Sequence, residues 1–103
     1  MSRYDFIAVY IMASGRNGTI YVGSTSELFI RVSQHKNGTF PGFTSKYGCR
    51  RLVWFEVHSD MAEAVRRERA IKHWPRAWKL KLIEDANPEW RDLSDDWYDV
   101  SDL

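Results

Sequence analysis

The stretch DFIAVYIMASGRNGTIYVG, residues 5–23, decides the fold of this chain. After Asp5, residues 6–12 are apolar or aromatic in both alternating sets, which is typical of a central strand covered on both faces. Residues 14–18 are polar and contain Asn-Gly, a pair that adopts positive φ at low cost and favours a tight turn. Residues 19–23 predict a returning strand, so the stretch as a whole predicts an antiparallel β-hairpin.

A helix, a loop and a third strand are predicted to follow the hairpin. Ser26 is expected to cap a helix over residues 27–37, which the Asn-Gly at its end would stop. Residues 38–50 contain three glycines and one proline and predict a loop. Residues 51–58, RLVWFEVH, are rich in β-branched and aromatic side chains and predict the third strand.

Two further helices complete the predicted domain. Asp60 followed by Glu63 predicts a capping box that opens a helix ending near His73. Pro75 suits the first turn of another helix over residues 75–86. The order strand, strand, helix, strand, helix, helix predicts an α+β domain: a three-stranded antiparallel sheet flanked by about three helices.

The last part of the chain differs in composition from the rest. We expect residues 1–87 to form the domain and residues 88–103 to be an acidic extension that packs partly on it. Four aromatic or apolar side chains of this extension favour packing: Trp90, Leu93, Trp97 and Tyr98.

Composition restricts the class of protein. A chain of 103 residues with 44% hydrophobic and 15% aromatic residues suits one globular domain and argues against disorder. The single cysteine, Cys49, excludes an internal disulfide and a zinc cluster of thiolates, and it favours a reducing compartment. No apolar run approaches the ~20 residues of a membrane span, so we expect no membrane association and a cytoplasmic location.

Charge is distributed unevenly along the chain. Residues 1–83 hold fourteen Lys and Arg against six Asp and Glu, whereas residues 84–103 hold one Arg against eight acidic residues. A basic body of this kind favours binding to polyanions such as nucleic acids. The alternative is an ordinary solvated surface.

Glu68 is the most informative single carboxylate. On a helix it shares a face with Ala64, Val65 and Ile71, so it is expected to point toward the body of the protein. A carboxylate in such a place needs a partner, because an unpaired buried charge is costly. The partner is either a basic side chain, as in a structural salt bridge, or a cation such as Mg²⁺.

Four other polar side chains form candidate catalytic pairs. Arg31 and His35 lie one helical turn apart, and they can hold a phosphate and move a proton, respectively. Tyr10 and Tyr21 lie on the two strands of the hairpin, where cations nearby would make a phenol more acidic. The alternatives are an amphipathic helix margin for the first pair and ordinary sheet aromatics for the second.

Together these positions resemble the GIY-YIG nuclease superfamily. The two signature motifs correspond to Ala8-Val9-Tyr10 and Tyr21-Val22-Gly23, with Ala8 in place of the usual glycine and valine twice in place of isoleucine. The family's later polar residues correspond to Arg31, His35, the metal-binding Glu68 and Asn87. The chain is similar to small stand-alone bacterial members, which resemble the N-terminal catalytic domain of the bacterial excision-repair nuclease.

The resemblance implies a DNA endonuclease with one divalent ion, Mg²⁺ or Mn²⁺, held by Glu68. Arg31 would stabilise the charge of the transition state, and His35 would assist proton movement or phosphate binding. One tyrosine would orient or deprotonate the attacking water, and we favour Tyr21, with Tyr10 positioning it. Three further roles are implied for Gly23, which would allow close backbone approach, and for Lys46 and Arg50, which would contact the DNA backbone.

The expected partner is DNA, with branched or damaged DNA among the candidate substrates and DNA repair among the candidate pathways. We expect a monomer or a weak homodimer. Two alternatives remain. One is a non-catalytic nucleic-acid-binding module of the same fold, and the other is an interaction protein in which Glu68 only forms a salt bridge with a basic side chain. The nuclease hypothesis requires that Tyr10, Tyr21, Arg31, His35 and Glu68 line one concave surface.

Overall fold

The computed structural model describes residues 6–39, 42–95 and 97, and these form a three-stranded antiparallel sheet with helices on both faces. The strands are β1 (Ala8–Ala13), β2 (Ile20–Thr25) and β3 (Arg51–Val57), in the spatial order β2-β1-β3. The helices are α1 (Leu28–Asn37), α2 (Phe43–Tyr47), α3 (Met61–His73) and α4 (Arg76–Ala86). The predicted α+β class and the antiparallel sheet are confirmed.

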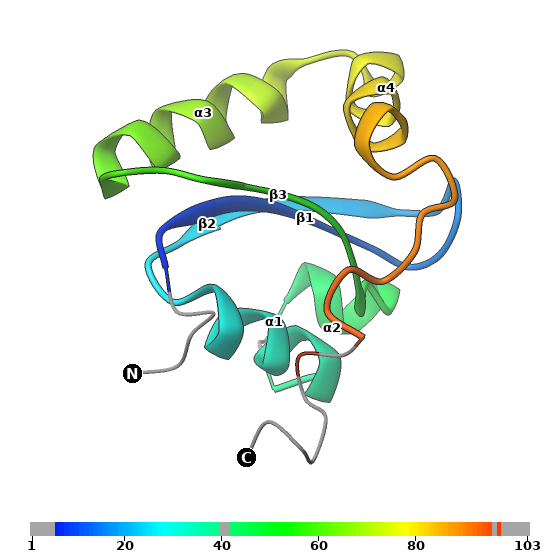
Figure 1. Ribbon diagram of the computed structural model, residues 1–103. Helices are drawn as coiled ribbons and strands as arrows, with labels where there is room; N and C mark the ends of the chain where they lie inside the picture. Colours follow the sequence, from blue (N-terminus) through cyan, green and yellow to red (C-terminus); the bar gives the residue numbers. More distant parts are fainter. Residues whose placement is uncertain (1–5, 40–41, 96, 98–103) are drawn as a thin grey trace.

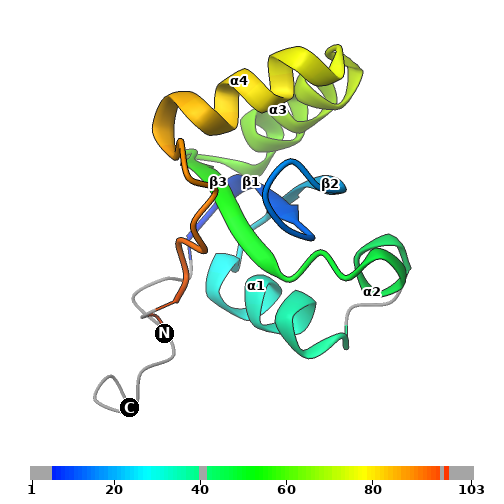
Figure 2. The same ribbon diagram turned by 90° about the vertical axis from the view of Figure 1, so that its right-hand side faces the viewer.

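Helices cover the sheet in two separate layers. The α3 and α4 helices lie on one face, and α1 and α2 lie on the other (Figures 1 and 2). All six residues of β1 are buried, because this strand has a neighbour on each side and a helical layer on each face. The prediction of a central strand from its two apolar sets is therefore confirmed.

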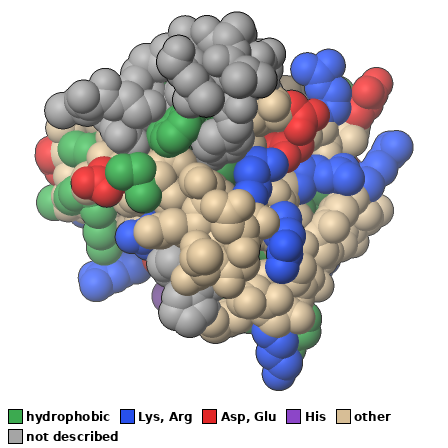
Figure 3. Space-filling view, turned by 90° about the horizontal axis from the view of Figure 1, so that it is seen from below, with side chains coloured by type: hydrophobic (Ala, Val, Ile, Leu, Met, Phe, Trp, Pro, Cys, Tyr) green, Lys and Arg blue, Asp and Glu red, His purple; other side chains and the backbone are tan. Residues whose placement is uncertain are grey.

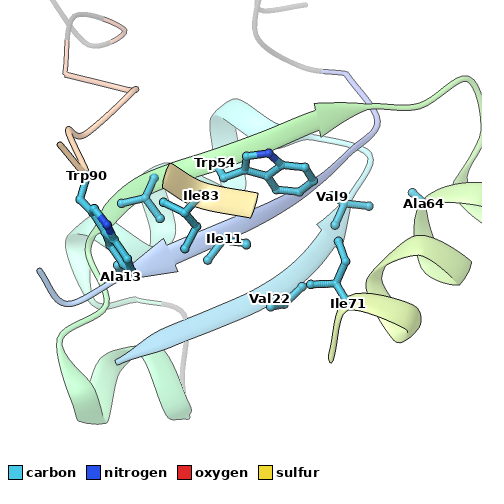
Figure 4. Close-up of a cluster of buried hydrophobic side chains, with 10 residues drawn as sticks. Val9, Ile11, Ala13, Val22, Trp54, Ala64, Ile71, Ile83 and Trp90 are labelled. Carbon is cyan, nitrogen blue, oxygen red and sulfur yellow. The ribbon is translucent and has the colours of Figure 1, made fainter. Parts of the chain in front are cut away.

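The alternation of side chains along β1 divides the core in two. Ile11 points to the α3–α4 face and Tyr10 to the α1–α2 face. Figure 4 shows the first cluster, which contains Val9, Ile11, Ala13, Val22, Val53, Trp54, Ala64, Ile71, Ile83 and Trp90. The second contains Ala8, Tyr10, Met12, Leu28, Val32, Cys49, Leu52 and Trp97. The position of a side chain along β1 or β2 thus decides whether it faces the α3–α4 layer or the α1–α2 layer.

The hairpin turn forms as predicted. Ser14 N donates to Thr19 O over 2.9 Å and closes the turn. Asn17 adopts a φ of 59°, the left-handed conformation that the Asn-Gly pair favours.

Two predictions about the next segment are wrong. Ser26 does not cap α1: the helix has Glu27 at its N-cap without a side-chain hydrogen bond, and Thr25 Oγ1 accepts from Glu27 N instead. The stretch predicted as a loop contains α2, whose two ends are Gly42 and Gly48, with φ values of 102° and 65°. Gly42 and Gly48, which suggested a continuous loop, instead flank a five-residue helix. They take the positive φ values that the chain needs at the two ends of this helix.

The start of α3 confirms the predicted role of Asp60 as the capping residue. Asp60 Oδ1 accepts a hydrogen bond from Glu63 N over 2.8 Å, as a capping residue should. Glu63 itself accepts from Ser59 Oγ over 3.2 Å.

The described part of the acidic tail packs along β3. Trp90 is fully buried and Trp97 is 6% exposed. Leu93 N donates to Leu52 O over 2.8 Å. Asp92 pairs with Lys36 of α1, and this ion pair ties the tail to the helix layer below the sheet. Tyr98 lies outside the described residues.

No helix within the described residues is long and apolar enough to cross a membrane. On the surface formed by the α1–α2 layer, Lys and Arg side chains gather along one side (Figure 3).

Candidate active site at the edge of the sheet

Three buried side chains form a hydrogen-bonded chain between the sheet and the α1–α2 layer. Tyr10 Oη lies 2.9 Å from His35 Nε2, and His35 Nδ1 lies 2.9 Å from Thr44 Oγ1. Tyr10 and His35 are fully buried, and Thr44 is 1% exposed. We call these three residues the buried half of the site. Its third member comes from α2, the helix that the sequence did not predict.

The environment keeps both rings neutral. Burial, together with the Arg31 guanidinium, lowers the pKa of His35 to about 4, so the imidazole is uncharged at neutral pH. Burial raises the pKa of the Tyr10 phenol above its ordinary value, and Arg31 opposes this through its charge and a side-chain hydrogen bond. Tyr10 is therefore a phenol at neutral pH and not a phenolate.

The direction of the hydrogen bonds follows from the donors and acceptors around Tyr10. Arg31 can only donate, so it cannot accept the Tyr10 proton. The buried O–H of Tyr10 needs an acceptor, and His35 Nε2 provides it. The imidazole proton then resides on Nδ1 and is donated to Thr44 Oγ1.

The two signature tyrosines lie side by side because of the strand register. Tyr10 is directly opposite Gly23 on β2, and Tyr21 is two residues further along the same face. The tyrosine rings are 6.2 Å apart, and the Tyr21 ring is 5.4 Å from that of His35. A Cβ at Gly23 would lie 2.7 Å from Tyr10 Oη and 2.9 Å from Tyr21 Cε2. Gly23 thus leaves room for both rings.

Glu68 lies on the other side of β2. Ser24 faces α3, and its hydroxyl donates to Glu68 Oε1. Lys72, one turn further along α3, places Nζ 2.6 Å from Glu68 Oε2. The Glu68 side chain is 17% exposed and that of Lys72 is 44% exposed. We call Ser24, Glu68 and Lys72 the edge half of the site.

The two halves meet around β2, which is an edge strand. Lys72 Nζ lies 5.8 Å from the centre of the Tyr21 ring, so this side chain extends from Glu68 to the tyrosine face. Glu68 is near enough to contribute to the raised pKa of Tyr10. A surface hollow of about 250 Å³ adjoins this junction and is lined by Ile20, Tyr21, Val22, Phe43, Lys72 and Lys79. The glutamate is therefore neither behind the core nor on a remote surface. Of the five side chains that were expected to line one concave surface, only Tyr21 lines this hollow: Tyr10 and His35 are fully buried, and Glu68 lies across β2.

The donors at Glu68 fit a hydrated divalent ion. Among the described residues, no group of three or more His, Cys, Asp or Glu side chains is placed to hold a metal. Mg²⁺ is commonly bound through one or two carboxylates, with water and substrate phosphate oxygens as the other ligands. Glu68 supplies one carboxylate, Ser24 a neighbouring hydroxyl, and the exposed Lys72 can move away from Oε2.

Other predicted site residues lie apart from this junction. The Asn87 amide donates to Val53 O over 3.1 Å and to Arg91 O over 2.8 Å, and so joins the end of α4 to β3 and the tail. Arg50 donates to Lys36 O at the end of α1 over 3.4 Å. Lys46 lies on α2, with Nζ 5.4 Å from the centre of the Tyr47 ring. The functional roles predicted for these residues stay predictions.

Three residues that contact the predicted set were not predicted: Ser24, Thr44 and Lys72. The sequence carries a signal for two of them. Lys72 follows Glu68 by four residues on one helix, and Ser24 follows Gly23 on the opposite face of the strand. Thr44 has no such signal, because its contact with His35 depends on how α2 packs.

Comparison with known proteins identifies the family. Residues 6–81 match the family model of the GIY-YIG catalytic domain. The chain belongs to this family. GIY-YIG domains are generally endonuclease domains that use a divalent metal ion, and the match contains Tyr10, Tyr21, Arg31, His35 and Glu68.

Relatives of similar length share the sequence and the fold. A UPF0213 protein of Staphylococcus epidermidis is 34% identical over 78 residues, which are 76% of this chain and 94% of that protein. A UPF0213 protein of Clostridium perfringens is 37% identical over 79 residues, 77% of this chain and 84% of that protein. The solution NMR structure of a UPF0213 protein from Bacillus halodurans has a TM-score of 0.53 at 26% identity, covering 89% of this chain and 96% of that one. Their names state no activity.

Proposed function

We propose that this protein is a metal-dependent endonuclease that hydrolyses phosphodiester bonds of DNA at the edge of β2. The observation that carries the proposal is the junction between the two halves of the site. A neutral phenol–imidazole chain and Arg31 lie on one face of the strand, and an accessible carboxylate lies on the other. Family membership supports the same reaction class.

Glu68 would hold the ion, with Ser24 orienting one carboxylate oxygen. When bound, a divalent ion supplies neutralisation of charge on the scissile phosphate and on the leaving oxygen. Lys72 would release Oε2 and remain beside the phosphate as a second cation, since its ammonium group lies between Glu68 and Tyr21. Mg²⁺ and Mn²⁺ both suit an oxygen ligand set.

Arg31 would bind the phosphate as negative charge develops on it. Its guanidinium is always protonated and offers several donors in one plane. The Arg31 guanidinium lies near enough to Tyr10 to lower the pKa of that phenol, so it is available on the tyrosine face. Such preorganised donors stabilise a transition state without further rearrangement.

Tyr21 would orient the attacking water. Tyr10 cannot serve as the base at neutral pH, because burial raises its pKa and keeps the phenol protonated, and its hydroxyl is already hydrogen-bonded to His35. Tyr21 is half-buried, lies beside the hollow, and has Lys72 over its ring. In this arrangement the rings of Tyr10 and His35 pack against Tyr21, Thr44 holds His35 by a hydrogen bond, and none of the three moves a proton in the reaction.

The decisive experiment is substitution of the carboxylate. Purified Glu68→Gln should lose about 10²-fold or more of its Mg²⁺- or Mn²⁺-dependent cleavage of plasmid, single-stranded and branched DNA. Thermal unfolding should be little changed, because the amide is isosteric and Glu68 is partly exposed. Glu89→Gln, an exposed position in the tail, is the matched control. Undiminished nicking by Glu68→Gln would disprove the proposal.

One observation favours a second candidate, a non-catalytic DNA-binding module. Both carboxylate oxygens of Glu68 have protein partners, Ser24 and Lys72, as a structural salt bridge would. Binding of DNA without cleavage over a full titration of both ions would support this candidate.

A further inference from the structure

The short helix α2 displays two aromatic rings on the surface. Phe43 and Tyr47 are 45% and 47% exposed, and they lie four residues apart on one face of the helix. Their ring centres are 4.7 Å apart. Thr44 is the residue that α2 buries. The helix therefore presents its aromatic side chains outward, although aromatic rings are usually used to fill a core.

These rings continue from the candidate active site. The Phe43 ring lies 6.2 Å from that of Tyr21, so Tyr21, Phe43 and Tyr47 form one aromatic row. The position of α2, and so of Phe43 and Tyr47, is held relative to the site, because Thr44 is hydrogen-bonded to the buried His35. The distance from Tyr21 to the outer ring is thus set by the fold and not by a free loop.

Cationic side chains accompany the aromatic row. Lys72 and Lys79 line the hollow together with Tyr21 and Phe43. Lys79 Nζ donates to Lys72 O over 3.1 Å, which holds its charge at the rim of the hollow. At the outer end, Lys46 Nζ lies 5.4 Å from the centre of the Tyr47 ring. The row therefore combines two half-exposed aromatic rings with positive charge at both of its ends.

We propose that the aromatic row binds unpaired nucleotides of the DNA strand next to the cleaved phosphate. Bases stack on Phe43 and Tyr47, while Lys46, Lys72 and Lys79 contact backbone phosphates. This combination of stacking rings and cations binds single strands with little sequence preference. Bases inside a duplex are stacked on each other and do not reach such rings, so the substrate class is DNA with a flap, gap or splayed end. The inference rests on the proposed function for the position of the cleaved bond.

Binding without cleavage tests this inference. The protein carries Glu68→Gln, divalent ions are removed with EDTA, and fluorescence anisotropy measures affinity for three dye-labelled probes: a single strand, a blunt duplex and a duplex with a single-stranded flap. Phe43→Ala and Tyr47→Ala should each weaken binding of the single strand and the flap about tenfold and leave the blunt duplex nearly unchanged. Tyr47→Phe should retain the affinity, because the ring is kept.

Matched controls come from α4. Trp78→Ala removes an aromatic side chain that is 59% exposed but lies against Trp74 and outside the hollow. Lys81→Ala is the control for Lys79→Ala, because Lys81 pairs with Asp85 and does not line the hollow. Both controls should bind all three probes as the parent does.

The outcomes separate this inference from the proposed function. Unchanged binding by Tyr47→Ala, an equal loss on the blunt duplex, or an equal loss in Trp78→Ala would overturn the inference. Tyr47 is half exposed, so its truncation is expected to leave the fold intact, and a thermal melt verifies this. If binding depends on Phe43 and Tyr47 but the protein that retains Glu68 does not cleave DNA in Mg²⁺ or Mn²⁺, only the nuclease proposal is disproved. If that protein cleaves DNA but binding does not depend on these two rings, only this inference is disproved.

Discussion

The two halves of the candidate site differ in almost every physical property. Tyr10, His35 and Thr44 are buried, neutral and connected by hydrogen bonds of ordinary length. Ser24, Glu68 and Lys72 are partly exposed and include two opposite charges. The difference indicates a division of labour: the buried half holds a fixed geometry, whereas the edge half can exchange partners with a cation or a phosphate. It also predicts that damage to the buried half lowers stability and that damage to the edge half changes ion binding.

The largest effect is expected from filling the space between the tyrosines. Gly23→Ala should lower the free energy of unfolding by about 2 kcal/mol, because its Cβ would lie 2.7 Å from the Tyr10 ring and both phenols must move. Cleavage should fall as well. Chemical denaturation measures the first effect, and a nuclease assay measures the second.

Gly15→Ala is the matched control for this change. A Cβ at Gly15 meets no atom within 4 Å, so its effect should stay within about 0.5 kcal/mol. Equal stability of the two variants would contradict the view that the buried half is closely packed.

A second effect on stability, of comparable size, is expected from acid. The pKa of His35 is about 4 in the folded protein and near 6.5 in an unfolded chain. The unfolded state therefore binds the extra proton first, and the stability contributed by neutral His35 is complete above pH 6.5 and is lost as the pH falls toward 4. We expect a loss of about 2 kcal/mol across this window from this residue.

Denaturation at several pH values, compared between the parent and His35→Gln, isolates this contribution. The variant should show a flatter profile between pH 6.5 and 4, whereas His73→Gln, at an exposed histidine, should follow the parent. Parallel profiles for the parent and His35→Gln would show that His35 is not held neutral by burial.

The smallest effect concerns the edge half. Lys72→Met removes the ammonium that occupies Glu68 Oε2, so the protein should bind Mn²⁺ about threefold more tightly in the absence of DNA. Unfolding free energy should change by less than about 1 kcal/mol, as is usual for an exposed pair. Calorimetric titration of Mn²⁺ measures the first quantity.

Lys81→Met serves as the control, since it also breaks an i,i+4 pair on a helix but lies away from Glu68. Weaker ion binding by Lys72→Met would mean that the lysine supports the ion site and does not compete with it. That result would contradict the view that the edge half exchanges its partners whereas the buried half keeps them.

The sequence alone determined the hairpin, the third strand and the two later helices. Local rules were sufficient for them: alternating apolar sets in β1, Asn-Gly in the turn, and Asp60 at the start of α3. It also predicted family membership, because the types and spacings of the candidate site residues in the hairpin, α1 and α3 resemble the family's signature, and the family model matches residues 6–81.

Only the tertiary structure decided where those side chains meet. The spatial order β2-β1-β3 makes β2 an edge strand, and at an edge the residues of both faces can approach one substrate. Thr44 is hydrogen-bonded to His35 through the packing of α2, and Asn87 is hydrogen-bonded to Val53, which is far from it in the chain. The physical reason is that periodicity and capping specify the face of an element, whereas the neighbour of that face depends on how the layers close around the sheet.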